Sequence, residues 1–204
     1  MRVVIITWEY PPRIVGDMAR HVERVASSLA DSGLDVSVVT FHDKLRGFER
    51  RSDGVNVYRV GNPVDPHLNV LTWDMTLAAE FERIVSDIYY SVRGEIDLID
   101  AHEWLSIVPG AMLKKAFGIP FIYSLHSLEE QRSHYADAPI NMAIRSLEHL
   151  GMCEASKVLV KSEWMKSEVE RLHNIPGDKI VSISPTSPTW AAETGKFYRK
   201  AVER

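Results

Sequence analysis

The sequence predicts one α/β domain built on a Rossmann-like, doubly wound and mostly parallel β-sheet with helices on both faces. Short apolar runs recur along the chain, and several are β-branched on both faces, which indicates strands that are covered on both sides. Segments with helical periodicity separate these runs, a rhythm typical of right-handed βαβ units. The length of 204 residues fits a single domain of this class.

The elements follow one another in a regular order. The predicted strands are Val3–Thr7, Val36–Phe41, Val55–Val60, Ile96–Ala101, Phe121–Leu125, Val158–Val160 and Ile180–Ile183. The predicted helices are Gly16–Ser32, Leu71–Val92, Ile107–Phe117, Ile140–Leu150 and Trp164–Leu172. A charged loop joins the second and third apolar runs, so we expect a hairpin or an excursion at the sheet edge between residues 36 and 60.

The last twenty residues differ from the rest. Two prolines, Pro185 and Pro188, break the chain, and Thr189 can cap a final helix with basic residues in its last turn. The apolar positions Trp190, Phe197, Tyr198 and Ala201 predict that this helix docks on the same domain. We therefore divide the chain into a domain at 1–184 and a terminal helix at 185–204.

Composition excludes several classes of function. The net charge of −4 provides no basic field for nucleic acid, and the chain has one cysteine, Cys153, which suits a reducing compartment.

We find no signal peptide and no membrane span, so we expect a cytoplasmic protein. Phosphate-loop, dinucleotide-binding and hydrolase-elbow motifs are absent from the sequence, and no His/Cys spacing suits a metal.

Candidate site residues come from the strand ends, because ligands of doubly wound sheets bind beyond the carboxyl ends of the strands. The first loop contains Glu9 and opens a helix at Gly16, where backbone N–H groups can meet a phosphate; a plain connection is the alternative. The fourth strand ends in His102, Glu103 and Trp104, which are residue types that bind sugars. In the alternative interpretation, His102 caps a helix and Trp104 belongs to the core. Asp97 and Asp100 on that strand are interpreted as edge or helix-contact charges.

A further strand ends in a histidine. His126 and Ser127 follow the run Phe121–Leu125, and a histidine in an open crevice is a versatile hydrogen-bonding group. A structural histidine and a turn-capping serine are the alternative interpretation.

Four segments in order resemble one family. They are EYPPRIVGDM at 9–18, DLIDAHEW at 97–104, YSLH at 123–126 and ASKVLVKSEWMK at 155–166. This series is similar to the N-terminal domain of GT-B retaining glycosyltransferases of the glycogen/starch synthase type. The resemblance implies a two-domain enzyme in which this domain holds the acceptor. A second domain would hold most of an ADP-glucose or UDP-glucose donor and an E-x₇-E pair, with no metal.

The resemblance also implies roles for individual residues. His126 would be the catalytic residue beside the transferred sugar. The remaining positions are a donor-phosphate loop at Arg13, Gly16 and Asp17, an acceptor crevice at Glu9, His102, Glu103, Trp104, Ser127 and Arg132, and a domain cleft at Ser162 and Glu163. Asp17 replaces a family glycine and would repel a diphosphate. Ile14 stands where relatives place a lysine, and Asp100 stands where they often have histidine.

We therefore expect the acceptor-side domain of a retaining glucosyltransferase that extends an α-glucan. Alone it would be inactive, because transfer needs donor and acceptor in register. The segment 185–204 resembles the family's returning helix, so we interpret the donor domain as deleted, naturally or by design. The alternatives are a non-catalytic glucan- or partner-binding module, a half enzyme with a mannoside or lipid-linked sugar as acceptor, and an unrelated nucleotide-binding protein.

Overall fold

The computed structural model describes residues 1–202 and contains one eight-stranded sheet in the order β3-β4-β2-β1-β5-β6-β7-β8. Every neighbouring pair is parallel except β3 with β4. The strands are β1 (Arg2–Thr7), β2 (Asp35–Phe41), β3 (Gly47–Arg50), β4 (Asn56–Val60), β5 (Leu98–His102), β6 (Phe121–Ser124), β7 (Lys157–Val160) and β8 (Ile180–Ser182). The predicted fold class is confirmed.

Seven helices surround this sheet in residues 1–202. They are α1 (Asp17–Asp31), α2 (Val70–Ser91), α3 (Ile107–Phe117), α4 (Glu129–Arg132), α5 (Pro139–Glu154), α6 (Glu163–His173) and α7 (Trp190–Val202), with 3₁₀ turns at Trp104–Ser106 and Gly177–Lys179. The Asn69 side chain caps α2 by accepting from two backbone N–H groups, and Gly118 ends α3 in the left-handed conformation.

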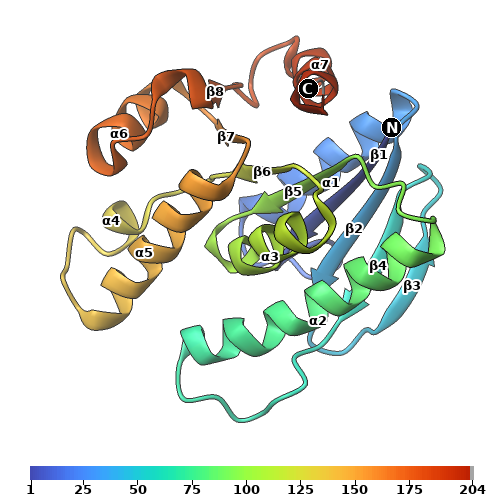
Figure 1. Ribbon diagram of the computed structural model, residues 1–204, viewed down its shortest axis with the longest axis horizontal. Helices are drawn as coiled ribbons and strands as arrows, with labels where there is room; N and C mark the ends of the chain where they lie inside the picture. The colour runs from blue at the N-terminus through green and yellow to red at the C-terminus, as the bar shows by residue number, and fades with distance from the viewer. Residues whose placement is uncertain (203–204) are drawn as a thin grey trace.

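Alternation along β1 divides the core into two layers. Val4 and Ile6 face a cluster with residues of α2, α3, α5 and α6, whereas Val3 and Ile5 face a second cluster with residues of α1 and α7 (Figure 1). All four side chains are fully buried, as expected for a parallel sheet that is covered on both faces.

The edge between residues 36 and 60 is an excursion. The two apolar runs become β2 and β4, which pair in parallel rather than as a hairpin. The charged segment between them supplies β3, which pairs antiparallel with β4 and ends the sheet. Each of the four β3 residues is exposed, which explains why no apolar run marked this strand.

Helix α7 returns to the sheet face that α1 covers. Its Tyr198 is fully buried in the second cluster, where Trp190, Phe197 and Ala201 pack as partly buried side chains. The Arg24 guanidinium of α1 lies 4.7 Å from the Trp190 ring centroid, a cation–π contact. The four predicted apolar positions of the helix are therefore those through which it docks.

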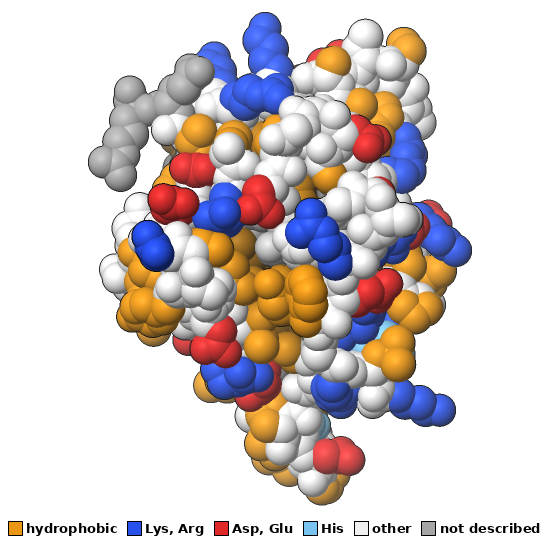
Figure 2. Space-filling view, turned by 90° about the vertical axis from the view of Figure 1, so that its right-hand side faces the viewer, with side chains coloured by type: hydrophobic (Ala, Val, Ile, Leu, Met, Phe, Trp, Pro, Cys, Tyr) orange, Lys and Arg blue, Asp and Glu red, His pale blue; other side chains and the backbone are white. Residues whose placement is uncertain are grey.

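The surface carries charges of both signs. Figure 2 shows a face on which Lys/Arg and Asp/Glu side chains are interspersed around a group of hydrophobic side chains. This face provides no continuous basic field, in keeping with the net charge of −4. Within residues 1–202, no helix combines the length and the apolar character that a membrane crossing requires.

Candidate functional site

A cavity of about 420 Å³ lies beyond the carboxyl ends of β1, β5, β6 and β7. It brings together most of the sequence-predicted site residues, although they are distant along the chain. Its lining is Trp8, Glu9, Gly16, Asp17, Met18, Val70, Trp73, Glu103, Trp104, Leu105, His126, Ser127, Arg132 and Lys161. Aromatic walls with a few convergent polar groups are typical of a small-molecule or sugar site.

Glu9 shapes the loop between β1 and α1. Its side chain is buried, and Oε2 accepts hydrogen bonds from the backbone N–H groups of Val15, at 2.6 Å, and Gly16, at 2.9 Å. These are N–H groups of the kind that a diphosphate would need at this helix N-terminus. In this conformation Glu9 therefore occupies the predicted donor-phosphate contact at Gly16.

Glu103 performs a similar task at the end of β5. Its Oε1 accepts from the backbone N–H groups of His126, at 2.7 Å, and Ser127, at 2.9 Å. Glu103 has a φ of 61°, a conformation that is uncommon outside glycine and that often marks functional sites. Burial raises the pKa of its carboxyl group, whereas Arg132, with Nη1 at 3.3 Å from Oε2, opposes that rise.

His126 reaches a second histidine below the cavity. Its Nε2 lies 2.8 Å from Nδ1 of His102, whose Nε2 lies 2.8 Å from Oδ2 of Asp100. Burial lowers the pKa of His126 well below its usual value, and His102, Lys161 and His21 add to this effect. His126 is therefore neutral near pH 7.

Asp100 and His102 differ from their sequence interpretations. Asp100 is fully buried in the central strand β5, so its interpretation as an edge or helix-contact charge was wrong. His102 is 1% exposed and contacts Asp100 through one ring nitrogen and His126 through the other, so it lies outside the cavity lining. Trp104 is buried but also lines the cavity.

Lys161 was missed by the sequence reasoning. It follows β7 directly, so the rule applied to the other strand ends would have found it. Burial lowers the pKa of Lys161, while the carboxylates of Glu103 and Asp17 oppose this shift. Asp17 therefore shares the cavity with a cation that offsets the negative charge predicted to repel a diphosphate. Trp8 and Trp73 were also missed because nothing local distinguishes a cavity wall from core.

Besides His102, three predicted residues lie outside the cavity lining, namely Arg13, Ser162 and Glu163. The Arg13 guanidinium pairs with Asp43 at 2.9 Å and lies over the rings of Trp8 and Phe41, so it is not directed at Gly16. The Ser162 hydroxyl accepts from the Met165 N–H and caps α6, and the exposed Glu163 begins that helix.

Arg132 is held by the protein itself. Its guanidinium contacts Glu129 at 3.0 Å and Glu148 at 2.5 Å, and it also donates to the Ser127 hydroxyl at 2.7 Å. Four buried carboxylates surround this residue and its neighbour Arg145, those of Glu103, Glu129, Glu130 and Glu148. Arg132, which was predicted as an acceptor contact, thus lines the cavity and also clamps the loop after β6.

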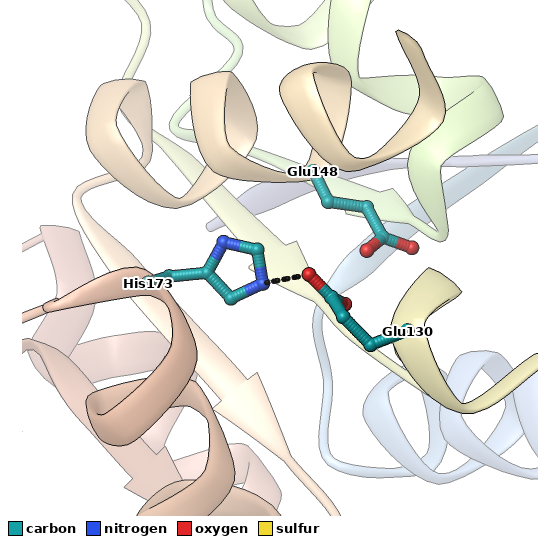
Figure 3. A group of neighbouring side chains, drawn as sticks. All are labelled: Glu130, Glu148 and His173. Atoms are coloured by element: carbon teal, nitrogen blue, oxygen red, sulfur yellow. Dashed lines mark ion pairs between the residues drawn. The ribbon is translucent and has the colours of Figure 1, made fainter. Parts of the chain in front are cut away.

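One cluster of side chains of the kinds that bind metal ions was not predicted from the sequence. Glu130, Glu148 and His173 place their ligand atoms within 4.8 Å of one another. Figure 3 shows His173 of α6 pointing at Glu130 of α4, with the Glu148 carboxylate of α5 beside them. The Glu148 carboxylate is already paired with Arg132, and Arg145 lies 3.9 Å from Glu130, so arginine supplies the positive charge here.

Comparison with known proteins gives the family. A family model described as "Glycosyl transferase 4-like domain" matches residues 16–186. An uncharacterized glycosyltransferase of Methanocaldococcus jannaschii is 36% identical over 202 residues, which cover 99% of this chain and 50% of the relative. Glycogen synthase of Mycobacterium tuberculosis is 26% identical over 187 residues, which cover 84% of this chain and 45% of the relative. The chain spans about half the length of these curated relatives.

Solved structures show the same fold. A sucrose-phosphate synthase chain from Thermosynechococcus elongatus superposes with a TM-score of 0.71 at 17% identity, and the match covers all of both chains. The catalytic domain of starch synthase IV from Arabidopsis thaliana, bound to ADP and acarbose, gives a TM-score of 0.64 at 16% identity, covering 93% of this chain and 52% of that one.

The order of the four motifs, the doubly wound sheet and these matches agree with one another. The chain belongs to the glycosyl transferase 4-like domain family and has the fold of the N-terminal half of a GT-B glycosyltransferase.

Proposed function

We propose that this chain is the acceptor-side half of a retaining glucosyltransferase that transfers glucose from a nucleotide-sugar to an α-glucan. The observation that carries this proposal is the cavity at the carboxyl ends of the strands, which combines tryptophan walls with His126, Lys161 and two glutamates. Tryptophan faces stack on sugar rings, and the polar groups between them fix hydroxyl groups. The match to a glycogen synthase and the starch synthase with bound ADP and acarbose support this substrate class.

The division of labour follows from the same cavity. Glu9 occupies the N–H groups of the first loop, so this half offers little to a diphosphate. We place the donor, ADP-glucose or UDP-glucose, mainly on a second domain that approaches along Ser162 and Glu163. Because the donor must be held in register with the acceptor, we expect no transfer by this chain alone.

Helix α7 fits this arrangement. We propose that the predicted terminal segment 185–204, whose last two residues lie outside the described part of the chain, contains in α7 the family's returning helix, joined to the domain at 1–184 without the donor domain between them. The match to the sucrose-phosphate synthase chain covers 100% of this chain, α7 included, and 100% of that chain, which supports a domain and a terminal helix that are joined directly.

Calorimetric titration tests the proposal. We expect maltoheptaose to bind to this chain and ADP-glucose and UDP-glucose to bind weakly. Val70→Lys places a charge at the cavity wall and should weaken glucan binding by about tenfold, whereas Met75→Lys on the same helix lies outside the lining and should leave it unchanged.

Other titration results would contradict the proposal. Tight binding of a sugar nucleotide alone would place the donor site here. Absence of glucan binding would favour a mannoside, a lipid-linked sugar or a protein partner as the occupant, and would reject the α-glucan assignment.

A further inference from the structure

A network of buried, hydrogen-bonded polar groups joins α7 to His126. Asp100 accepts from the Ser124 hydroxyl through Oδ1, at 2.6 Å, and its Oδ2 contacts both the Tyr198 hydroxyl and His102 Nε2. Asp100 and Tyr198 are fully buried, and 98 residues separate them in the sequence. Three donors therefore converge on one carboxylate in the sheet centre, an arrangement that favours its ionised form.

This arrangement determines where the ring protons lie. An ionised carboxylate only accepts hydrogen bonds, so His102 must carry its proton on Nε2. In neutral His102 the Nδ1 atom is then an acceptor, and its neighbour at 2.8 Å, Nε2 of His126, must donate to it. The remaining nitrogen of neutral His126, Nδ1, is left with a free lone pair.

That lone pair has no partner within the described part of the chain. The Nδ1 atom of His126 is buried and accepts no hydrogen bond from residues 1–202. Buried polar atoms are normally satisfied, and His126 lines the cavity, so this unpaired acceptor leaves a place for a donor that the described residues do not supply. Of the titratable groups nearby, His21 of α1 packs edge-on against the His126 ring at 5.2 Å between centroids, and Lys161 follows β7.

We propose that Asp100, His102 and Tyr198 hold His126 in the tautomer whose Nδ1 accepts a hydrogen bond, with Tyr198 of α7 as a positioning residue. This inference rests on the proposed function, in which His126 faces the transferred sugar. Nδ1 would accept from a sugar hydroxyl, and the Asp100 carboxylate at the far end would stabilise positive charge that develops near the ring. In hydrolase triads, too, a carboxylate holds the catalytic histidine in one tautomer.

¹⁵N NMR of the protein labelled with ¹⁵N-histidine tests the hydrogen bonds from Asp100 through His102 to His126 without any sugar. At about pH 8, above the ordinary histidine pKa of ~6.5, we expect His126 and His102 both to carry the ring proton on Nε2. A wild-type spectrum in which His126 carries its proton on Nδ1 would overturn the proposal, and this result needs no variant. Failure of glucan binding would refute the proposed function but would leave this spectrum unaffected.

Variants identify the positioning residues. Asp100→Asn removes the obligate acceptor, so His126 should lose its single tautomer and show shifts displaced toward the Nδ1–H form. Tyr198→Phe and Ser124→Ala each remove one donor to Asp100, so the hydrogen bond from His102 Nε2–H to this carboxylate should strengthen and the ring nitrogen shifts of His102 should change. Phe197→Leu, a matched packing change on α7, should leave these shifts unchanged. Equal shifts in Tyr198→Phe and Phe197→Leu would show that Tyr198 only packs.

Discussion

Two loops at the carboxyl edge of the sheet use the same device for different purposes. Glu9 after β1 and Glu103 after β5 each accept two consecutive backbone N–H groups with one carboxylate oxygen. Glu9 binds N–H groups of its own loop, whereas Glu103 crosses to the loop after β6 and fixes the backbone of His126. The first clamp shapes a turn, and the second positions His126, the residue that we propose to be catalytic.

The charges around the two clamps differ as well. Glu103 also forms an ion pair with Arg132, which in turn contacts Glu129 and Glu148. The cavity side of Glu103 adds the charge of Lys161. Glu9 forms no ion pair among residues 1–202. The loop that carries His126 therefore depends on the balance of buried charges, whereas the first loop depends on hydrogen bonds.

Removal of Arg132 should have the largest effect. Arg132→Met leaves the buried carboxylates of Glu103 and Glu148 without their shared cation, so we expect a loss of about 3–5 kcal/mol in the free energy of unfolding at pH 7. Chemical denaturation measures this loss. Arg83→Met, which removes exposed pairs with Glu80 and Asp87, is the control and should change stability by about 0.5 kcal/mol or less. Similar losses in both variants would show that the clamp is not a buried charge network.

Protonation of Glu148 should have the next largest effect. Burial raises the pKa of this carboxyl group from 4.5 to about 7, and Arg132 limits the rise. A raised pKa means that the folded state favours the protonated form, so this stabilisation is complete below pH 4.5 and is lost as the pH rises through about 7. The loss corresponds to about 3 kcal/mol.

The matching variant is Glu148→Gln, which cannot titrate. Denaturation between pH 4.5 and 7.5 should show a steeper decline with pH for the wild type than for the variant. Parallel profiles would contradict a raised pKa at Glu148 and would weaken the contrast between the two loops.

The first loop should show the smallest effect. Glu9→Gln keeps an oxygen acceptor but removes its charge, so we expect a loss of about 1 kcal/mol. Amide hydrogen exchange should accelerate at Val15 and Gly16 and stay unchanged at His126 and Ser127. Faster exchange at both pairs would mean that the two clamps act as one unit.

The sequence predicted the sheet well because its signals are local. Each apolar run between Val3 and Ile183 became a strand, and the shared carboxyl edge brought Glu9, Glu103 and His126 to one cavity. The strand β3 was not predicted because its exposed residues have no apolar pattern.

The contacts of the site residues were beyond sequence reasoning. Glu9 and Glu103 are the residue type that binds sugar hydroxyls, yet their carboxylates accept backbone N–H groups, and loop conformation decides between these partners. The Asp100–Tyr198 contact depends on how α7 docks, which a local pattern does not specify. Arg13 was expected beside Gly16, but aromatic rings and Asp43 provide its partners.

Chemical-shift mapping with maltoheptaose tests whether the cavity beyond the carboxyl ends of the strands binds an α-glucan. Backbone amide signals of this chain would be followed as the glucan is added. We expect the largest shifts in the loops after β1, β5, β6 and β7, around Trp104, His126 and Lys161. Shifts concentrated instead at the edge cavity lined by Phe48, Tyr58 and Arg83, with none at these loops, would contradict it.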